Sequence, residues 1–371
     1  MTILAILSLL IWLYLLFGHG RFWQSGPILP MLHPSTAPPV AVIVPARDEA
    51  PLIAASLRSL LAQDYAGPFR VILVDDGSTD GTGEIARMLN DPRLSVLSGA
   101  APPPGWSGKL WAVQQGVTEA GPAELLLLTD ADIVHEPAHL RALVAQAERF
   151  ELDMVSEMVR LACDSPAERA LVPAFVFFFQ LLYPFAWVNN GSRATAAAAG
   201  GTILVRQRAM QRIGGIDSVK TALIDDVALA AAIKKGGRIW LGHAALARSV
   251  RPYPRVVDIW RMVTRTAYVQ LRYSPLLLIG TTLAMAMIWI VPPVVALTAH
   301  GVAFWCGMAT WIMLAMSYLP TLRRFGRSAL WAPLLPLVAA FYTAATIGSA
   351  VNHYAGRGVA WKGRAYQGGG A

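Results

Sequence analysis

Nine residues, LLLLTDADI at 125–133, constrain the fold of this chain more than any other stretch. Four consecutive leucines are typical of a strand buried on both faces, as in parallel sheets. The strand is expected to end beside Asp130 and Asp132, and the carboxyl edge of an open α/β sheet is where ligands bind. Two close carboxylates repel each other, so they need a cation or hydrogen-bond donors nearby. The alternative interpretation is a helix N-cap with an acidic first turn, which also favours Asp.

The chain between residues 40 and 253 alternates predicted strands with predicted helices. Strands are expected at 40–45, 69–74, 94–98 and 125–129, and again after the glycine turn at 200–201. Helices are expected at 52–60, 84–90 and 109–119, from Pro137, and from Ile224 to a stop at Gly236. This alternation predicts an α/β fold with a parallel, doubly wound sheet and a nucleotide at its carboxyl edge.

Composition places part of the chain in lipid. Mean hydropathy is +0.47 and charged residues make up 15% of the chain, against roughly 25% in soluble domains. Residues 2–17 are apolar and uncharged, and Arg21 follows them, which favours a short membrane anchor with its charged side in the cytoplasm. Residues 275–319 are long enough for two crossings, and 330–352 for a third or, because of two prolines, a re-entrant form.

A net charge of +8 and a pI near 9.7 indicate contact with an anionic membrane face. No Lys/Arg-rich run or RNA-binding signature favours nucleic acid. Residues 254–273 are predicted to form an amphipathic interfacial helix, and the basic loop at 323–327 is expected in the cytoplasm. Cys163 and Cys306 have neither disulfide-framework nor metal spacing, which fits a reducing compartment.

The aromatic segment at 173–188 is short and is interrupted by Gln180 and Pro184. A crossing here would put the carboxylates near 130 and near 225 on opposite sides of the membrane. If both serve one site, the segment is expected to lie in the interface, which its aromatic residues suit. A buried core helix is the alternative.

Acidic residues stand where loops meet at the edge of such a sheet, and cations accompany them. The acidic residues are Glu49, Asp75, Asp76, Asp130, Asp132, Asp225 and Asp226, and the cations are Lys109 and Arg265. Transfer from a nucleotide-sugar needs carboxylates for ribose and a divalent metal, and cations for the leaving diphosphate. A further carboxylate must accept the proton of the acceptor hydroxyl.

Several of these residues also have structural interpretations. Asp75 can cap a turn and Asp225 a helix, while Lys109 can be a solvated residue at a helix start. The sequence HEPAH, from His135 to His139, matches the HExxH zinc motif. We reject a zinc site, because Pro137 would begin a helix there and a third ligand is not evident.

Six motifs in order resemble family 2 inverting glycosyltransferases with a GT-A fold. They are PARDEA, VDDGSTDGT, GWSGK, TDAD, GGT…RIGG and IDDVALA, spread over about residues 40–270. The GWSGK loop, the membrane segments at both ends and WKGRAY (361–366) make the chain most similar to the lipid-glycosylating branch, and most like bacterial hopene-associated glycosyltransferases. The resemblance implies a GT-A (Rossmann-like, mostly parallel sheet) domain with N-terminal and C-terminal transmembrane helices.

The resemblance also implies a role for each matching residue. Pro45, Arg47 and Glu49 would line the nucleotide pocket, Asp76 would face the base, and Lys109 would lie near the diphosphate; Asp130 would contact ribose and metal, Asp132 would bind the metal, Asp226 would be the base with Asp225 beside it, and Arg265 would contact the diphosphate.

One motif departs from the family pattern. Where many relatives have (Q/R)xxRW, this chain has MVTRT at 262–266. Arg265 is retained, but Met262 and Thr266 replace the first residue and the tryptophan. The diphosphate role of Arg265 therefore stays in the prediction, and an acceptor-side role for the missing tryptophan does not.

The predicted protein is a cytoplasmic-facing enzyme of a bacterial inner membrane. It would use Mg²⁺ or Mn²⁺ and a UDP-sugar to glycosylate a lipid hydroxyl, such as that of a hopanoid or triterpenoid. The alternatives are a polyprenyl-phosphate sugar synthase and a transporter or flippase with a nucleotide-sensing domain. A transporter would need charged residues inside its spans. It is disfavoured because, of Asp, Glu, Lys, Arg and His, residues 275–319 contain only His300 and residues 330–352 contain none.

The expected domain organisation follows from these segments. It comprises an anchor (1–20), a Pro-rich linker (21–39), a catalytic domain (40–253), an amphipathic interfacial helix (254–273), a C-terminal membrane segment (274–352) and a basic tail (353–371).

Overall fold

A computed structural model describes residues 1–356, 360–361 and 364–365. It divides the chain into two compact units. The helical unit comprises Met1–Gly26, Cys163–Ala186 and Pro252–Val359, and the sheet unit comprises the remaining segments. Within the WKGRAY stretch, residues 362, 363 and 366 lie outside the described residues. The others belong to β9 (Ala360–Trp361) and β10 (Arg364–Ala365), which pair antiparallel.

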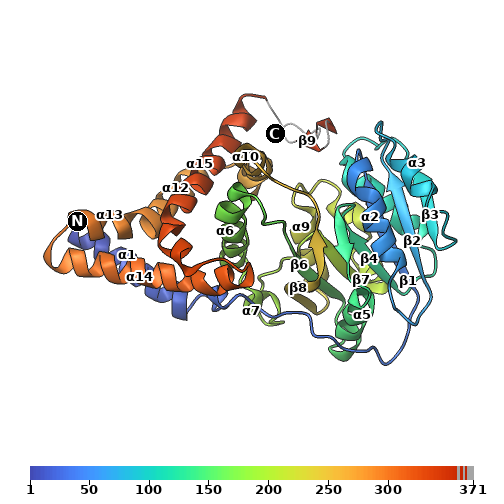
Figure 1. Ribbon diagram of the computed structural model, residues 1–371, viewed down its shortest axis with the longest axis horizontal. Coiled ribbons are helices and arrows are strands. Elements are labelled where there is room, and N and C mark those ends of the chain that lie inside the picture. Colours follow the sequence, from blue (N-terminus) through green and yellow to red (C-terminus); the bar gives the residue numbers. More distant parts are fainter. Residues whose placement is uncertain (357–359, 362–363, 366–371) are drawn as a thin grey trace. The chain divides into compact units, whose positions relative to one another are not determined.

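Parallel strands form one half of the sheet, as predicted (Figure 1). β1 (Val40–Ala46) pairs in parallel with β2 (Phe69–Asp75) and with β4 (Leu125–Thr129). On the far side, β2 pairs in parallel with β3 (Leu94–Ser98). Every residue of β1 and β4 is buried, because both faces of a parallel sheet are covered by helices.

The other half of the sheet is mixed. β7 (Thr202–Arg206) runs antiparallel to both β4 and β6 (Met154–Arg160), β8 (Ile239–Ser249) is parallel to β6, and β5 (Ile133–His135) is antiparallel to β8. In the described residues the order of the eight strands is β3-β2-β1-β4-β7-β6-β8-β5. The α/β class with a mostly parallel sheet is thus confirmed, and β4 is the strand at which the direction changes.

The LLLLTDADI stretch does not form one strand. β4 ends at Thr129, and the Ile133 N–H bonds to the Asp130 carbonyl at 3.2 Å, which closes a turn before β5. No helix begins at Asp130, so the N-cap interpretation of this stretch is wrong.

Short helices connect the strands and cover the sheet. They are α2 (Ala50–Leu61), α3 (Thr82–Arg87), α4 (Gly108–Glu119), α5 (His139–Arg149), α8 (Gln207–Arg212), the 3₁₀ turn η2 (Ile216–Val219) and α9 (Asp225–Lys234). A four-residue helix, α7 (Phe185–Val188), lies where the chain passes between the units. The predicted stripe of α2 is buried at Ile53, Ser56, Leu57 and Leu60.

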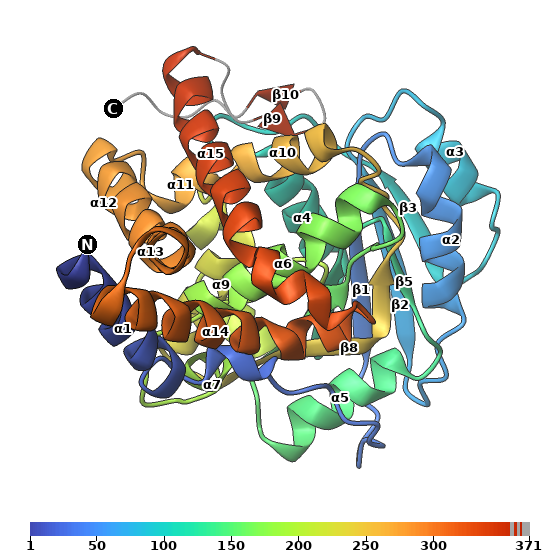
Figure 2. The same cartoon turned by 60° about the vertical axis from the view of Figure 1, so that its left-hand side comes forward.

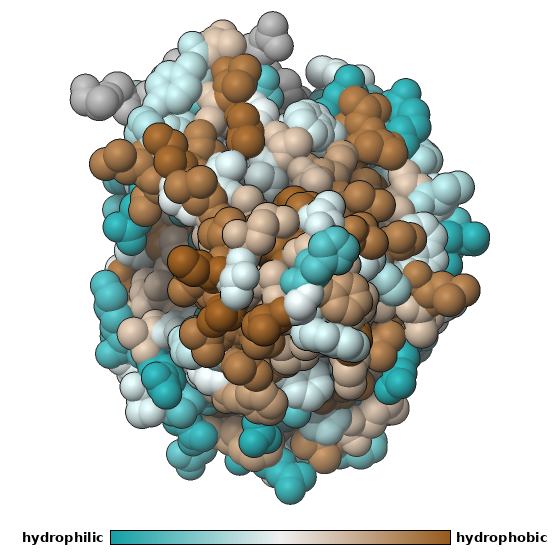
Figure 3. Space-filling view, turned by 90° about the vertical axis from the view of Figure 1, so that its left-hand side faces the viewer, coloured by the Kyte–Doolittle hydropathy of each residue, from teal (hydrophilic) through white to brown (hydrophobic). Residues whose placement is uncertain are grey.

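The helical unit is built from α1 (Thr2–Phe17), η1 (Phe22–Gln24), α6 (Pro166–Leu182), α10 (Val256–Thr264), α11 (Ala267–Gln270), α12 (Pro275–Met285), η3 (Ala286–Ile290), α13 (Val291–Thr298), α14 (Gly301–Arg324), η4 (Ala329–Leu334) and α15 (Leu335–Tyr354) (Figure 2). Three helices of the described residues are long and apolar enough to cross a membrane: Pro275–Thr298, Gly301–Arg324 and Ala329–Tyr354. The first two are separated at His300, as predicted. Hydrophobic side chains spread over the face of this unit shown in Figure 3.

Aromatic and polar contacts hold the helical unit together. The Trp12 indole donates to the Ile288 carbonyl at 2.8 Å, and its ring packs edge-on against Trp289. Phe177 and Phe178 of α6 also pack edge-on against Trp289, at centroid distances of 6.1 and 5.3 Å. The aromatic segment predicted at 173–188 therefore contributes buried rings to this unit, chiefly through α6.

The fold predicts a steric limit where α4 packs on β1. A Cβ on Gly116 would lie 2.5 Å from Ile43 Cγ2. Gly116→Val should therefore destabilise the protein by about 1–3 kcal/mol through overpacking, which lowers the midpoint of thermal unfolding of the purified protein. Gly191→Ala is the control, because a Cβ there meets no atom of the described residues within 4 Å. Equal midpoints for the two variants would contradict this packing.

Candidate active site

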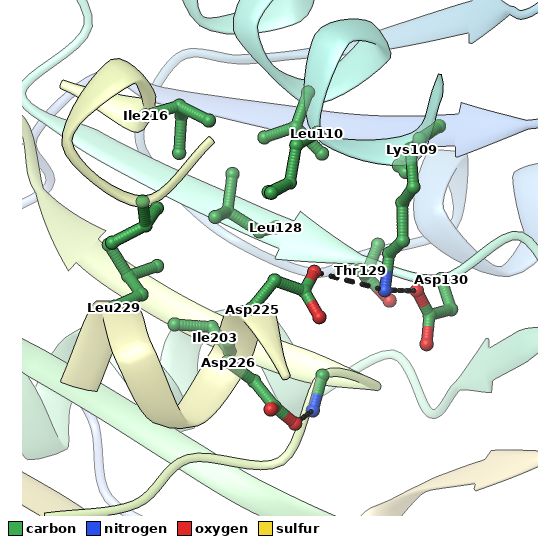
Figure 4. A pocket seen from close by; sticks show the side chains of 14 residues that line it. Lys109, Leu110, Leu128, Thr129, Asp130, Ile203, Ile216, Asp225, Asp226 and Leu229 are labelled. Carbon is green, nitrogen blue, oxygen red and sulfur yellow. Dashed lines mark hydrogen bonds and ion pairs between the residues drawn. The ribbon is translucent and has the colours of Figure 1, made fainter. Parts of the chain in front are cut away.

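Five of the predicted residues line one pocket at the end of β4. They are Pro45, Lys109, Asp130, Asp225 and Asp226. Pro45 comes from β1, Lys109 from the first turn of α4, Asp130 from the residue after β4, and the two other acids from the first turn of α9. Figure 4 shows Asp130 and Asp225 on either side of the Lys109 ammonium, while the Asp226 carboxyl group lies below them and accepts the Gly200 N–H. The predicted edge of the sheet therefore does gather these side chains.

Lys109 is the cation of this pocket. Its Nζ lies 3.0 Å from Asp130 Oδ1 and 3.5 Å from Asp225 Oδ2. Ser107 caps α4 by accepting a hydrogen bond from the Leu110 N–H, which fixes the turn that presents the lysine. Burial acts to lower the pKa of Lys109, but Asp130 and Asp225 outweigh it and raise that pKa. Lys109 is thus a permanent positive charge, and not a solvated helix-start residue.

Asp226 is a pocket acid with a raised pKa. Burial, and then repulsion from Asp225, raise the pKa of Asp226 to about 7. Attraction to Lys109 opposes that rise, and so do two backbone donors: the Val227 N–H at 2.8 Å from Oδ1 and the Gly200 N–H at 2.9 Å from Oδ2. A carboxyl group that titrates near neutral pH can both accept and release a proton under working conditions.

Asp225 and Asp130 are carboxylates held by the lysine. Ile224, and not Asp225, occupies the N-cap position of α9, so the capping interpretation of Asp225 is wrong. Burial raises the pKa of Asp130, and attraction to Lys109 opposes that rise. Asp130, Asp225 and Lys109 thus form a charged group on one side of the pocket.

Gly200 leaves room between these charges. A Cβ at this position would lie 3.5 Å from Asp226 Oδ2, 3.6 Å from Lys109 Nζ and 3.8 Å from Asp130 Oδ2. The backbone of the glycine turn therefore borders all three groups, and a side chain here would fill the space that they face.

A second group of charges holds Glu49 and Asp132. Arg251 Nη2 donates to both carboxylate oxygens of Glu49, at 2.6 and 2.7 Å, and Arg251 Nε lies 3.3 Å from Asp132 Oδ2. The Ser249 hydroxyl donates to the same Asp132 oxygen at 2.7 Å. Ser249 and Arg251 were missed by the sequence reasoning. The sequence does indicate that two buried acids need a cation nearby. It does not show that the residues at the end of β8 lie beside them.

Arg47 and Asp76 form a third group. Arg47 Nη1 donates to the Asp76 carbonyl and lies 3.6 Å from its carboxylate. Asp75 accepts the Ser78 N–H at 2.9 Å, as the turn-capping interpretation predicts. Arg265 belongs to the helical unit, at the C-cap of α10, and the other predicted site residues belong to the sheet unit.

No group of three or more His, Cys, Asp or Glu side chains in the described residues is arranged to hold a metal ion. Asp130 and Asp132 offer hard carboxylate oxygens, which suit Mg²⁺ or Mn²⁺ only if substrate phosphates supply further ligands.

Curated relatives share parts of this chain. An O-antigen biosynthesis protein, RfbC, from Myxococcus xanthus is 28% identical over 48% of this chain and 15% of its own length. A 4,4'-diaponeurosporenoate glycosyltransferase from Staphylococcus aureus is 36% identical over 25% of this chain and 24% of its own length. The chain thus spans less than a quarter of the length of these relatives.

Among solved structures, a mannosyltransferase from Pyrobaculum calidifontis in complex with GDP-Man and Mn²⁺ is similar in fold. The TM-score is 0.60 at 20% identity, and the match covers 94% of this chain and 98% of that one. This likeness confirms the GT-A-like fold.

The model of glycosyl transferase family 21 matches residues 2–369. The sequence resemblance was to family 2, and what the match confirms is the broader assignment to the glycosyltransferases. The chain belongs to glycosyl transferase family 21 and is a glycosyltransferase.

Proposed function

We propose that this protein is a membrane-bound enzyme that transfers a sugar from a UDP-sugar to a lipid hydroxyl, with inversion at the anomeric carbon. The observation that carries the proposal is the pocket in which Asp226, with its pKa near 7, faces the Lys109–Asp130 ion pair. A base and a cation in one pocket are the two groups that such a displacement requires.

Asp226 is the proposed base. The acceptor oxygen attacks the anomeric carbon, the bond from that carbon to the diphosphate oxygen breaks, and the hydroxyl proton passes to Asp226. The Gly200 and Val227 N–H groups hold the carboxylate in one orientation during this step. The diphosphate leaves with its growing negative charge, which Lys109 stabilises.

Asp130 and Asp132 are the proposed ligands of Mg²⁺ or Mn²⁺. When bound, the ion would supply Lewis-acid stabilisation of the leaving diphosphate. Lys109 and Arg251 pair with these two carboxylates, and with a metal bound there both cations would be free to contact phosphate oxygens. Pro45, Arg47, Glu49 and Asp76 are proposed to bind the nucleotide.

Lipid is the proposed acceptor. Three helices long enough to span a membrane accompany the catalytic site in one chain. The Staphylococcus aureus relative is named for glycosylation of diaponeurosporenoate, which adds weight to an apolar acceptor. A hopanoid, another triterpenoid or a different membrane lipid would carry the hydroxyl.

The proposed setting is a bacterial inner membrane, crossed several times, with the catalytic domain at 40–253 in the cytoplasm. The predicted anchor, linker, interfacial helix and tail complete this organisation, and Arg265 is proposed to contact the diphosphate. The transporter alternative loses its basis because the chain is a glycosyltransferase. A polyprenyl-phosphate acceptor is the rival that the first experiment below distinguishes.

Asp226→Asn should lower kcat by at least a hundredfold, since removal of a general base costs about 10²–10⁴. Binding of the UDP-sugar, measured by calorimetry, should change less than threefold. Asp217→Asn is the matched control, because that carboxylate is exposed and pairs with Lys220. Turnover retained by Asp226→Asn would contradict the base assignment and favour an acceptor that is already an anion, such as a polyprenyl phosphate.

The pH profile should reflect the raised pKa of Asp226. Below about pH 7 the carboxyl group is protonated and cannot accept the acceptor proton, so kcat/KM should fall tenfold per pH unit there and level off above it. Asp225→Asn removes a repelling charge, which lowers the pKa of Asp226 and moves the acidic limb to lower pH. A limb at the same pH in both proteins would show that another group controls it.

The parts of the chain before and after the aromatic segment at 173–188 should both be accessible from the cytoplasmic side. In a chain without Cys163 and Cys306, Glu84→Cys and Asp217→Cys place exposed thiols before and after the aromatic segment. An impermeant maleimide should label both in inverted vesicles and neither in right-side-out vesicles. Labelling of the two positions from opposite faces would refute a single site and the interfacial placement of 173–188.

A further inference from the structure

A buried chain of hydrogen bonds joins the rejected HEPAH motif to the candidate active site. Glu157 Oε2 lies 2.6 Å from His139 Nε2, the Nδ1 atoms of His139 and His135 lie 2.8 Å apart, and His135 Nε2 lies 3.2 Å from Thr129 Oγ1. None of the four side chains is more than 3% exposed. They come from β6, α5, β5 and β4, in that order, so the hydrogen bonds connect three strands and one helix.

The direction of this chain is determined at its Thr129 end. The hydroxyl of Thr129 has one proton, and the Gly201 carbonyl, at 2.8 Å, can only accept it. His135 Nε2–H must therefore donate to Thr129, which leaves the His135 Nδ1 lone pair to accept from His139 Nδ1–H. Burial lowers the pKa of His135, which agrees with a neutral ring that donates from one nitrogen and accepts at the other.

The same logic requires a proton between His139 and Glu157. His139 uses its Nδ1–H toward His135, so a hydrogen bond at Nε2 needs either a second ring proton or a protonated Glu157. In both cases the pair is neutral overall, which lowers the cost of burying it. The other oxygen of Glu157, Oε1, has no hydrogen-bond partner among the described residues.

Both segments that meet at the end of the chain belong to the catalytic pocket. Thr129 immediately precedes Asp130. Gly201 immediately follows Gly200, whose N–H holds Asp226 Oδ2 at 2.9 Å. The bond from Thr129 to Gly201 thus ties the strand that carries Asp130 to the glycine turn that orients Asp226, across 72 residues of sequence.

We propose that Glu157, His139, His135 and Thr129 act together as positioning residues, which set the glycine turn at 200–201 and through it the orientation of Asp226. This inference rests on the proposed function of Asp226 as base. Four polar side chains at a buried site cost stability, the more so because Glu157 Oε1 has no hydrogen-bond partner among the described residues. The geometry that they impose on the pocket would account for that cost.

Replacing Thr129 gives the most direct test. Thr129→Val keeps the shape and removes the hydroxyl, which leaves the His135 N–H without its acceptor. The kcat of the purified full-length protein should fall about ten- to a hundredfold, while the KM for the UDP-sugar changes less than threefold. Thr129→Ser restores the hydroxyl and should keep kcat within about threefold of the original.

Glu157 tests the far end of the chain. The amide of Glu157→Gln can donate to His139 Nε2 and so preserves the direction of every bond, and this variant should keep kcat within about threefold. Glu157→Leu has similar volume but no donor, and it should lower kcat as Thr129→Val does. A loss of kcat that is the same for Gln and Leu would overturn the proposal, as would full activity in Glu157→Leu or Thr129→Val.

A buried residue outside the chain separates positioning from stability. Gln63 hydrogen-bonds to the Ser59 and Glu136 carbonyls and to the Leu140 N–H, at the start of α5. Gln63→Leu should lower the thermal midpoint and leave the kcat of the folded protein unaltered, with the folded fraction counted by UDP binding. A kcat loss in Gln63→Leu equal to that in Thr129→Val would show that the hydrogen-bonded residues have a purely structural role.

Histidine NMR provides a readout independent of turnover. In ¹⁵N-histidine-labelled protein, His135 should appear as the neutral Nε2–H tautomer, and Thr129→Val should perturb its signals more than Gln63→Leu does. The Nδ1–H tautomer at His135 would overturn the direction of the chain. The two proposals fail in different ways. If the base assignment is wrong, Asp226→Asn remains active. If only the positioning proposal is wrong, Asp226→Asn is inactive and Thr129→Val is fully active.

Discussion

Neutralisation of carboxylates at one edge of the sheet is the constraint on which this site depends. Strands β1 and β4 and helix α9 bring acidic side chains to that edge, and acids this close repel each other unless cations separate them. Lys109 does this for Asp130 and Asp225, and Arg251 for Glu49 and Asp132. Both cations are paired within the protein. A bound phosphate would therefore replace a carboxylate as the partner of a cation, and a bound metal would replace a cation as the partner of a carboxylate.

The three pocket acids differ in the partners that hold them. Asp130 and Asp225 are within 3.5 Å of the Lys109 ammonium, and Asp226 instead receives two backbone N–H bonds. Backbone donors stabilise a carboxylate less than a full opposite charge does at the same distance. Burial and the charge of Asp225 therefore prevail at Asp226 over attraction to Lys109 and the two backbone donors, and they raise its pKa.

The sequence predicted local features well and lateral neighbours poorly. Unbroken apolar runs located β1, β2 and β4 to within a residue or two, and the residues after each run proved to line the edge of the sheet. The antiparallel entry of β7 beside β4 was not predicted, because a run such as TILVR has the same pattern in either direction. Arg251 and the buried His135–His139–Glu157 contacts depend on those lateral neighbours, and so they could not be predicted either.

The change of direction at β4 also has a consequence for how the chain must fold. β4 pairs with β1 on one side as soon as it is made, but its other side waits for β7, whose Gly201-linked start is 72 residues away from Thr129. The segment Cys163–Ala186 of the helical unit is synthesised in that interval. A nascent chain therefore carries β4, a strand that is buried in the folded sheet, with one edge open while α6 is already emerging, and such an edge is prone to wrong pairing. That edge can close before the three helices that are long and apolar enough to cross a membrane are made, because all three follow β8 in the sequence.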